Sequence, residues 1–404
     1  MSTTRGIADS ADLRASNVAR ALSEIRRKGG AARVDLVEAL ELSPATVSAV
    51  ISELLEADLI IEAPATAAAG RGRPRIQLSL NPKARFVAGA KLGDDKVTVA
   101  ILDFCGEVLS TGEIGTDAPT VDASTLLTKI DIALKRALDG AGLKDKDIAA
   151  FGLGIPGFIE IESGLCLWSP VLSGAPIDLR SLLARRLSCP IFVDNDANLA
   201  TMAELWFGYG RDERDFLVVT VENGVGLGIV LDNRLFRGAR GLGAEFGHTK
   251  VQIDGALCRC GQRGCLEAYV SDYAIAREAG LAVEGSVRPD EILDRLAEQA
   301  KAGHDVSASI YRRAGRMLGL GLANLLNIFD PPLIVLAGEH IQNHELLAEE
   351  IERTIAANSL SVNRPAARVA VHRWGSQLWA RGAGALALDG LMSRTPLDQE
   401  ELAG

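Results

Sequence analysis

The amino-acid sequence predicts an α/β protein with an N-terminal winged helix-turn-helix and an actin-like or hexokinase-like duplicated α/β body that contains a cleft. Three observations predict this fold class. Apolar residues recur at helical spacing in the first 80 residues. Two strand–turn–strand segments of the body resemble each other, and three cysteines lie within eight residues. We expect a DNA-binding head over residues 1–80. The body is expected to have a first half at 84–197 and a second half with the cysteines at 198–375, and a last helix at 376–392 should pack back onto the first half.

Length and charge limit the class of protein. The chain has 404 residues, enough for two or three domains, and a formal net charge of −10. Residues 1–76 contain ten Lys and Arg and ten Asp and Glu, so the body carries the acidic excess. A neutral head can bind DNA where its arginines cluster. No stretch approaches the roughly 18 apolar residues of a membrane span. The N-terminus also lacks the apolar core of a signal peptide. We therefore expect a cytoplasmic protein with no membrane contact.

Two helices are expected before residue 42. The apolar positions of the first are Val18, Leu22 and Ile25. Those of the second are Val34, Val37 and Leu40. Gly29 and Gly30 end the first helix, because glycine is a poor helix former and suits a helix terminus.

A third helix is expected to begin at Ser43-Pro44, because serine caps helix N-termini and proline suits the first turn. It should bury Val47, Val50, Ile51, Leu54 and Leu55. Short uncharged residues face outward on its first turns: Ala45, Thr46, Ser48, Ala49 and Ser52. Such residues suit a helix that enters a DNA major groove about 12 Å wide. The second and third helices thus predict a helix-turn-helix.

A strand at 59–61 and a second strand with alternating Ile76, Leu78 and Leu80 predict a wing. Its tip carries Arg71, Arg73 and Arg75. Arginines on a thin loop suit a narrow A·T-rich minor groove, where negative potential is concentrated. The alternative is that helices and hairpin form only a packing or dimerisation module.

The body contains an internal duplication. Phe86–Asp103 and Phe216–Asp232 each read as strand, glycine-containing turn and strand. Such a repeat is typical of actin-like or hexokinase-like folds, which hold a ligand between their halves. Between the two segments, the run from Asp194 to Asn198 follows an apolar stretch. Its acids and amides could hydrogen-bond a polyol, and a carboxylate there could act as a general base. Alternatively, the run is a turn or a helix cap.

Cysteines give the strongest chemical signal. Cys258, Cys260 and Cys265 flank a short glycine-bearing loop, and His248 is the nearest histidine. Three thiolates and one imidazole complete a tetrahedral structural zinc site with no open position. The alternative is a set of reduced cysteines without metal.

Four motifs together resemble the ROK family (repressors, open reading frames and kinases). They are Gly154-Ile155-Pro156-Gly157, the Asp194–Asn198 run, Glu245-x-Gly-His248, and the cysteine pattern that ends at Glu267. The N-terminal winged helix is typical of the family's repressors, similar to the xylose and N-acetylglucosamine regulators. The resemblance implies sugar contacts from Gly157, Asn195, Asp196, Glu245, His248 and Glu267. It also implies zinc binding by His248, Cys258, Cys260 and Cys265. Asp196 matches the catalytic base of the kinases.

The sequence departs from the family's kinases on the nucleotide side. Their D-x-G-G-T-K phosphate loop aligns with Lys91–Lys96, where Lys91, Asp94 and Asp95 replace Asp, Gly and Thr. Glycine lets backbone amides approach a phosphate, and added carboxylates repel one. Two further regions on the nucleotide side differ from the kinase motifs, at Glu222-Asn223 and at Glu339. We therefore expect no enzymatic activity.

These observations favour a repressor of carbohydrate uptake or catabolism genes. Its expected partners are double-stranded operator DNA and a monosaccharide or sugar-phosphate effector. Because helix-turn-helix proteins read paired half-sites, we expect a homodimer or homotetramer. Two alternatives remain: a sugar kinase that uses ATP, and a regulator that responds to a protein partner or to zinc.

Overall fold

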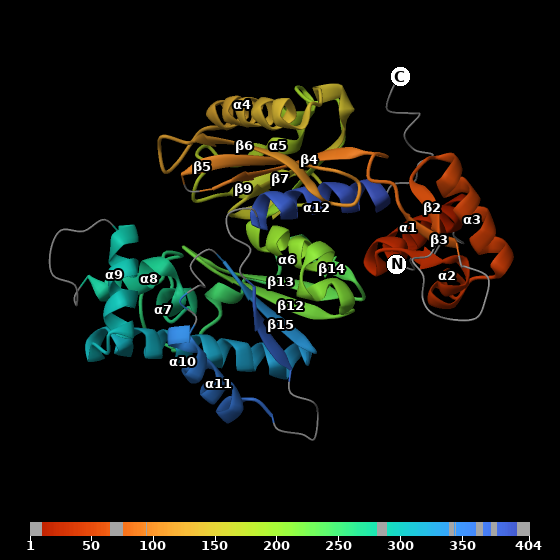
Figure 1. Cartoon of the computed structure of the whole chain (residues 1–404). Coiled ribbons are helices and arrows are strands. Elements are labelled where there is room, and N and C mark those ends of the chain that lie inside the picture. The colour runs from red at the N-terminus through yellow and green to blue at the C-terminus, as the bar shows by residue number, and fades with distance from the viewer. Residues whose placement is uncertain are drawn as a thin grey trace, which may run out of the picture. The chain divides into compact units, whose positions relative to one another are not determined.

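The computed structural model describes residues 10–64, 76–93, 95–280, 289–338, 343, 345–360, 367–372 and 378–393 (Figure 1). The chain divides into two units. The first contains the residues up to Gly157, Glu162–Asp194 and the residues from Ala380 onward, and the second contains Phe158–Ile161 and Asn195–Trp379. No helix in the described part of the chain has the length and apolar character needed to cross a membrane.

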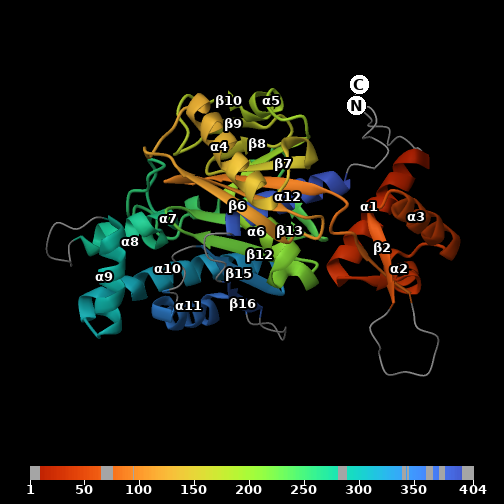
Figure 2. The same ribbon diagram turned by 45° about the horizontal axis from the view of Figure 1, so that its top comes forward.

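The N-terminal segment is a winged helix-turn-helix, which confirms this part of the predicted fold. Its elements are α1 (Ser10–Lys28), β1 (Ala31–Ala32), α2 (Arg33–Leu40), α3 (Pro44–Glu56), β2 (Ile60–Pro64) and β3 (Ile76–Leu80). The strands form a sheet in the order β1-β3-β2. Figure 2 shows strand β2 of this segment with the three helices α1, α2 and α3. All three helices bury apolar side chains, among them Val18, Leu22, Ile25, Leu36, Val47, Ile51 and Leu54.

The buried face of α2 differs from the predicted one. Leu36 is fully buried together with Leu40, whereas Val34 is 56% exposed. The two buried leucines are four residues apart, so they lie on one face of the helix. Ala31 and Ala32 pair with β3 directly before α2 and set the direction in which the helix starts. Leu55, predicted to be buried in α3, is half-buried.

The first unit contains a five-stranded sheet in the order β11-β7-β4-β5-β6. Its strands are β4 (Phe86–Leu92), β5 (Lys96–Leu102), β6 (Val108–Gly115), β7 (Ile148–Ile155) and β11 (Ile191–Asn195). Strand β4 pairs antiparallel with β5 and parallel with β7. Smaller elements of this unit are η1 (Asp145–Asp147), β9 (Leu165–Trp168), β10 (Ile177–Asp178) and α5 (Leu179–Ala184).

Two helices, α4 (Ala123–Ala141) and α12 (Leu378–Ser393), cover this sheet from opposite faces (Figure 1). A Cβ atom on Gly152 of β7 would lie 2.0 Å from the carbonyl oxygen of Ala383. The backbones of β7 and α12 therefore approach each other at a position that leaves no room for a side chain.

The second unit repeats this plan in a sheet of order β14-β13-β12-β15-β16. Its strands are β12 (Phe216–Val221), β13 (Val225–Leu231), β14 (Arg234–Phe236), β15 (Leu333–Ala337) and β16 (Arg368–Val371). Here β12 pairs antiparallel with β13 and parallel with β15. Because each sheet is built on an antiparallel hairpin extended by later strands, the predicted duplication is confirmed.

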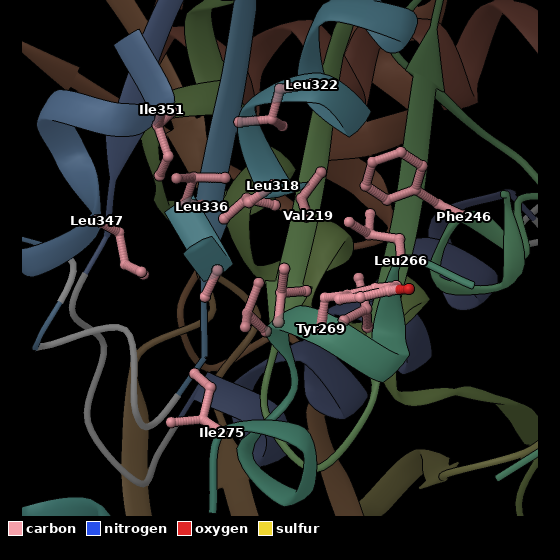
Figure 3. Close-up of a cluster of buried hydrophobic side chains, with 14 of the residues drawn as sticks. Val219, Phe246, Leu266, Tyr269, Ile275, Leu318, Leu322, Leu336, Leu347 and Ile351 are labelled. Atoms are coloured by element: carbon pink, nitrogen blue, oxygen red, sulfur yellow. The ribbon is translucent and has the colours of Figure 1, made fainter. Parts of the chain in front are cut away.

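Helices on one side of the second sheet enclose its core (Figure 3). The remaining elements of this unit are β8 (Phe158–Glu160), α6 (Asp196–Phe207), η2 (Tyr209–Asp212), η3 (Phe246–His248), α7 (Glu267–Val270), α8 (Asp272–Ala279), α9 (Pro289–Lys301), α10 (Asp305–Phe329) and α11 (Glu345–Asn358). Phe246, Leu266 and Tyr269 belong to this core. They flank the segment that carries the cysteines and so anchor it on both sides.

Candidate metal centre and adjoining carboxylates

The segment from His248 to Glu267, here named the cysteine loop, turns back on itself through short hydrogen bonds. The amide of Cys258 donates to the carbonyl of Gln262 at 2.8 Å, and Gly261 donates to Cys258 at 3.0 Å. Gly264 has a φ of 77°, and a Cβ atom there would lie 1.9 Å from the carbonyl oxygen of Gln252. The loop therefore folds too tightly at Gly264 for any other residue.

This fold brings four potential ligands together. One ligand atom from each of His248, Cys258, Cys260 and Cys265 lies within 4.8 Å of the others. Cys258 Sγ is 3.7 Å from His248 Nδ1, and Cys260 Sγ is 3.7 Å from Cys265 Sγ. With Zn–S of about 2.3 Å and Zn–N of about 2.0–2.1 Å, a tetrahedron has S–S and S–N edges of about 3.8 and 3.6 Å. The spacing and the donor set therefore fit a zinc ion.

The three cysteines of the candidate metal centre differ in their exposure to solvent. Cys258 and Cys265 are buried, whereas Cys260 is exposed. Burial raises the pKa of the Cys258 thiol to about 12. Because metals bind the thiolate, occupation of the site must release this proton.

Two further residues contact the cysteines and were not predicted. Lys250 Nζ lies 2.9 Å from Cys265 Sγ, and this hydrogen bond raises the pKa of Lys250. Tyr273 Oη lies 3.7 Å from Cys258 Sγ and 3.4 Å from Glu267 Oε1. Neither residue belongs to a recognisable spacing pattern, so only the folded loop identifies them.

Three carboxylates gather beside the cysteine loop in the second unit. Burial, followed by the negative charges of Asp196 and Glu267, raises the pKa of Glu245 to about 7. Glu267 is buried and lies 3.5 Å from Cys258 Sγ, and its Oε2 accepts a 3.4 Å hydrogen bond from the amide of Val225. Glu267 thus connects the carboxylate group to the candidate metal centre.

The start of α6 adds an amide to this group. Asn195 caps the helix, and its Oδ1 accepts a 2.8 Å hydrogen bond from the amide of Asn198. Asp196 follows as the first helical residue. The predicted Asn195, Asp196, Glu245, His248 and Glu267 all belong to the second unit. Gly157 belongs to the first unit, where its φ is 131° and a Cβ atom would meet the carbonyl oxygen of Trp168 at 2.1 Å.

Comparison with known proteins identifies the relatives of this chain. The model of the ROK family matches residues 87–390. The chain belongs to the ROK family. It is similar to the xylose repressor of Caldicellulosiruptor bescii, with 31% identity over 81% of this chain and 84% of that protein. The resemblance that the motifs predict is therefore confirmed.

Two solved ROK structures cover different shares of the chain. The crystal structure of a ROK family transcriptional regulator, a homolog of the E. coli MLC protein, matches 97% of this chain and 100% of its own, with a TM-score of 0.80 and 27% identity. A ROK family glucokinase from Streptomyces griseus, in complex with glucose and AMPPNP, matches 75% of this chain and 99% of its own, with a TM-score of 0.64 and 31% identity. The longer match confirms the predicted fold class and shows that this ROK protein has the architecture of the regulators.

The turn predicted to correspond to the phosphate loop of ROK kinases connects β4 and β5. It is closed by a 2.8 Å hydrogen bond from the amide of Gly93 to the carbonyl of Lys96. Asp95 is exposed at this turn, and Lys96 pairs with Glu113 at 3.2 Å. Asp94 and Glu339 lie outside the described residues.

The predicted DNA-contacting residues of this ROK protein lie at the start of α3. Ser43 Oγ accepts a 3.1 Å hydrogen bond from the amide of Thr46, which caps the helix as expected. Thr46 is half-buried, and the other four are exposed: Ala45, Ser48, Ala49 and Ser52. The predicted Arg71, Arg73 and Arg75 lie outside the described residues.

Proposed function

We propose that this ROK protein is a DNA-binding transcriptional repressor of carbohydrate genes, and that a monosaccharide or sugar phosphate controls it. The N-terminal winged helix-turn-helix is the observation that carries this proposal. The regulator structure matches 97% of the chain and the glucokinase structure only 75%, and the family model begins at residue 87. The head is thus what distinguishes this chain from the kinases.

The exposed start of α3 supports a role in reading DNA. Small side chains there allow the helix to approach base edges closely, and Thr46, Ser48 and Ser52 offer hydroxyls. In the proposal, Arg71, Arg73 and Arg75 of the wing contact the minor groove and the phosphates. Paired half-sites would be read by a homodimer or homotetramer.

The carboxylate group supports sugar binding. Asn195, Asp196, Glu245 and Glu267 offer acceptors suited to the hydroxyls of a sugar, and Gly157 would provide a backbone contact. His248 directs Nδ1 toward Cys258, which leaves Nε2 as its second hydrogen-bonding atom. One imidazole would thus serve the metal and the sugar together.

Zinc is the metal that we assign to the cysteine loop. His248, Cys258, Cys260 and Cys265 would hold it, and because they complete a tetrahedron we assign it a structural role. When bound, zinc would stabilise the loop between His248 and Glu267, two of the proposed sugar contacts.

Sugar binding would control DNA affinity by favouring one of two arrangements of the protein. An effector shifts such an equilibrium only as far as its affinities for the two states differ. We propose that the sugar favours the state that releases DNA.

The DNA test uses the full-length zinc-loaded protein and a labelled duplex from upstream of its own gene. We expect the affinity for this duplex to fall as the salt concentration rises. We also expect one sugar from a panel of monosaccharides and their phosphates to lower this affinity. The double variant R71A/R73A should lower affinity and reduce the salt slope by about one for each lost phosphate contact. Absence of binding at low salt to any of a set of upstream and intergenic duplexes from the same genome would overturn the proposal.

Glucokinase similarity supports one alternative, a sugar kinase that uses Asp196 as its base. Incubation with ATP and the same sugar panel, with product detected by coupled ADP release, separates the two functions. The repressor proposal expects no turnover, because Asp94 and Asp95 stand where kinases need Gly and Thr. Sustained turnover that is lost in the D196N variant would establish the kinase instead.

A further inference from the structure

Lys250 is an exposed residue near the start of the cysteine loop, and its side chain contacts three parts of the loop. Its Nζ is 2.9 Å from Cys265 Sγ, 2.6 Å from Gln262 Oε1 and 3.3 Å from the carbonyl oxygen of His248. The main chains of Lys250 and Cys265 also form an antiparallel β-bridge. One side chain therefore joins the sulfur of one candidate ligand to the backbone of another.

The charge of the site explains why a cation would be needed at this position. Three thiolates, a neutral imidazole and a divalent ion carry a net charge of −1. Cys258 and Cys265 are buried, and an uncompensated charge in such a place is unfavourable. The buried carboxyl of Glu267, 3.5 Å from Cys258 Sγ, supplies no positive charge. The ammonium of Lys250 offsets the charge of the ion and its four ligands, and it can donate a charge-assisted hydrogen bond to the Cys265 thiolate.

Arginines near the loop make other contacts. The guanidinium of Arg259 stacks on Tyr273, 3.8 Å from the ring centroid. Arg277 donates to the carbonyls of Leu257 and Ala268, and Arg263 donates to the carbonyl of Gly255. These groups bind the backbone or a ring, whereas Lys250 reaches a sulfur.

We propose that Lys250 is a positioning residue of the metal centre, whose ammonium neutralises the thiolate cluster and holds Cys265 and His248 in place as ligands. An ammonium has no lone pair, so Lys250 cannot itself be a ligand. The inference rests on the proposed zinc site and adds a residue outside the four ligands.

Zinc affinity of the full-length protein tests this role directly. Competition with a chromophoric chelator gives the zinc Kd of the wild type and of K250M, K250Q and K250R. The matched control is K301M, because Lys301 is an exposed lysine of α9 that pairs with Asn343 and Glu345 at 3.1 and 3.0 Å. We expect K250M and K250Q to weaken zinc binding by about 10–100-fold, as is typical for loss of a residue that supports the ligands.

The variants separate charge from packing. K250Q keeps hydrogen-bond donors without the charge, so it should weaken binding as K250M does. K250R keeps the charge and should remain within about threefold of the wild type, like K301M. Thiolate-to-cobalt absorption of the cobalt-loaded variants should persist, because all three thiolates remain.

Each contrary result has a distinct meaning. Wild-type affinity in both K250M and K250Q overturns the inference, and wild-type affinity in K250Q alone overturns its charge argument. A wild-type protein that binds no zinc removes the proposed zinc site itself, and the inference with it. Circular dichroism checks the fold of each variant, and K250Q with K250R still decides the question if K250M does not fold.

Discussion

The cysteine loop contains a complete set of candidate metal ligands, whereas the β4–β5 turn lacks the Gly and Thr of the kinases' phosphate loop. The cysteine loop brings all four candidate ligands within 4.8 Å of one another. The β4–β5 turn keeps its closing hydrogen bond between Gly93 and Lys96, but Asp95 is exposed at its tip. The hairpin around this turn is regular, with Lys91 opposite Thr98 and Leu92 opposite Val97.

The β4–β5 hairpin thus has a regular backbone although the residues of its turn differ from the kinase motif. The hairpin fold depends on strand pairing and burial, which tolerate a change of side chain at the exposed turn. A metal site depends on each donor atom, so the loss of a single ligand can abolish metal binding.

Removal of one ligand should have the largest effect. C258S should lose the zinc that we expect at about one ion per chain, because a serine hydroxyl is a poor zinc ligand. The melting temperature should fall by about 10 °C, since bound metal stabilises the folded state. Elemental analysis and a thermal melt measure both quantities. The control is C105S, because Cys105 lies outside the cluster and contacts the carbonyl of Leu80. Equal zinc in both variants would contradict the assignment.

Two glycines of the cysteine loop offer a matched pair of backbone changes. Gly264 and Gly261 have φ of 77° and 85°, so alanine is strained by a similar amount at each. A Cβ atom on Gly264 would lie 1.9 Å from a backbone oxygen, whereas nothing lies within 4 Å of one on Gly261. G264A should therefore lose about 1–3 kcal/mol more unfolding free energy than G261A. Urea melts of the zinc-loaded variants give the two free energies of unfolding. Equal values for G264A and G261A would mean that the loop has room for a side chain at Gly264.

Restoring kinase-like residues in the β4–β5 turn should strengthen ATP binding moderately. The variant D94G/D95T removes two carboxylates that repel phosphates, and each such repulsion amounts to about 1 kcal/mol in water and more near a protein surface. We expect ATP affinity to rise by about tenfold in isothermal titration calorimetry. The control is D117N, which removes an exposed carboxylate that pairs with Lys129 at 2.7 Å. If the double variant binds ATP no better than D117N, the two aspartates do not limit ATP affinity.

Neutralisation of Glu245 should have the smallest effect, and one that depends on pH. The pKa of Glu245 is raised from 4.5 to about 7, so the folded state holds this proton more tightly than the unfolded state. Protonated Glu245 therefore contributes its full stabilisation of the folded state below pH 4.5, and this contribution is lost as the pH rises through 7. E245Q should therefore melt at the same temperature as the wild type at pH 4.5 and about 1–2 °C higher at pH 8, because the partly exposed side chain is screened. E298Q, on an exposed glutamate of α9, is the control. A gain that is as large at pH 4.5 as at pH 8 would contradict this assignment.

Much of the fold could be predicted from short-range patterns. Helical spacing identified α1 and α3, and the Ser43 cap with Pro44 marked the start of α3. The repeated segments identified both hairpins, because strand–turn–strand units depend mainly on neighbouring residues. The predicted buried face of α2 was wrong at Val34, because Leu36 is buried and Val34 is exposed.

Sequence alone determined the donor set of this protein: one histidine and three cysteines with a spacing that suits a single ion, and a head that the kinases lack. Tertiary structure decided which side chains surround those donors. The contact of Lys250 with Cys265, and the proximity of Asp196, Glu245 and Glu267, join residues from separate elements of the second unit. Such contacts leave no periodic pattern in the chain, because they arise only when α6 and the Phe246–His248 segment both fold against β13.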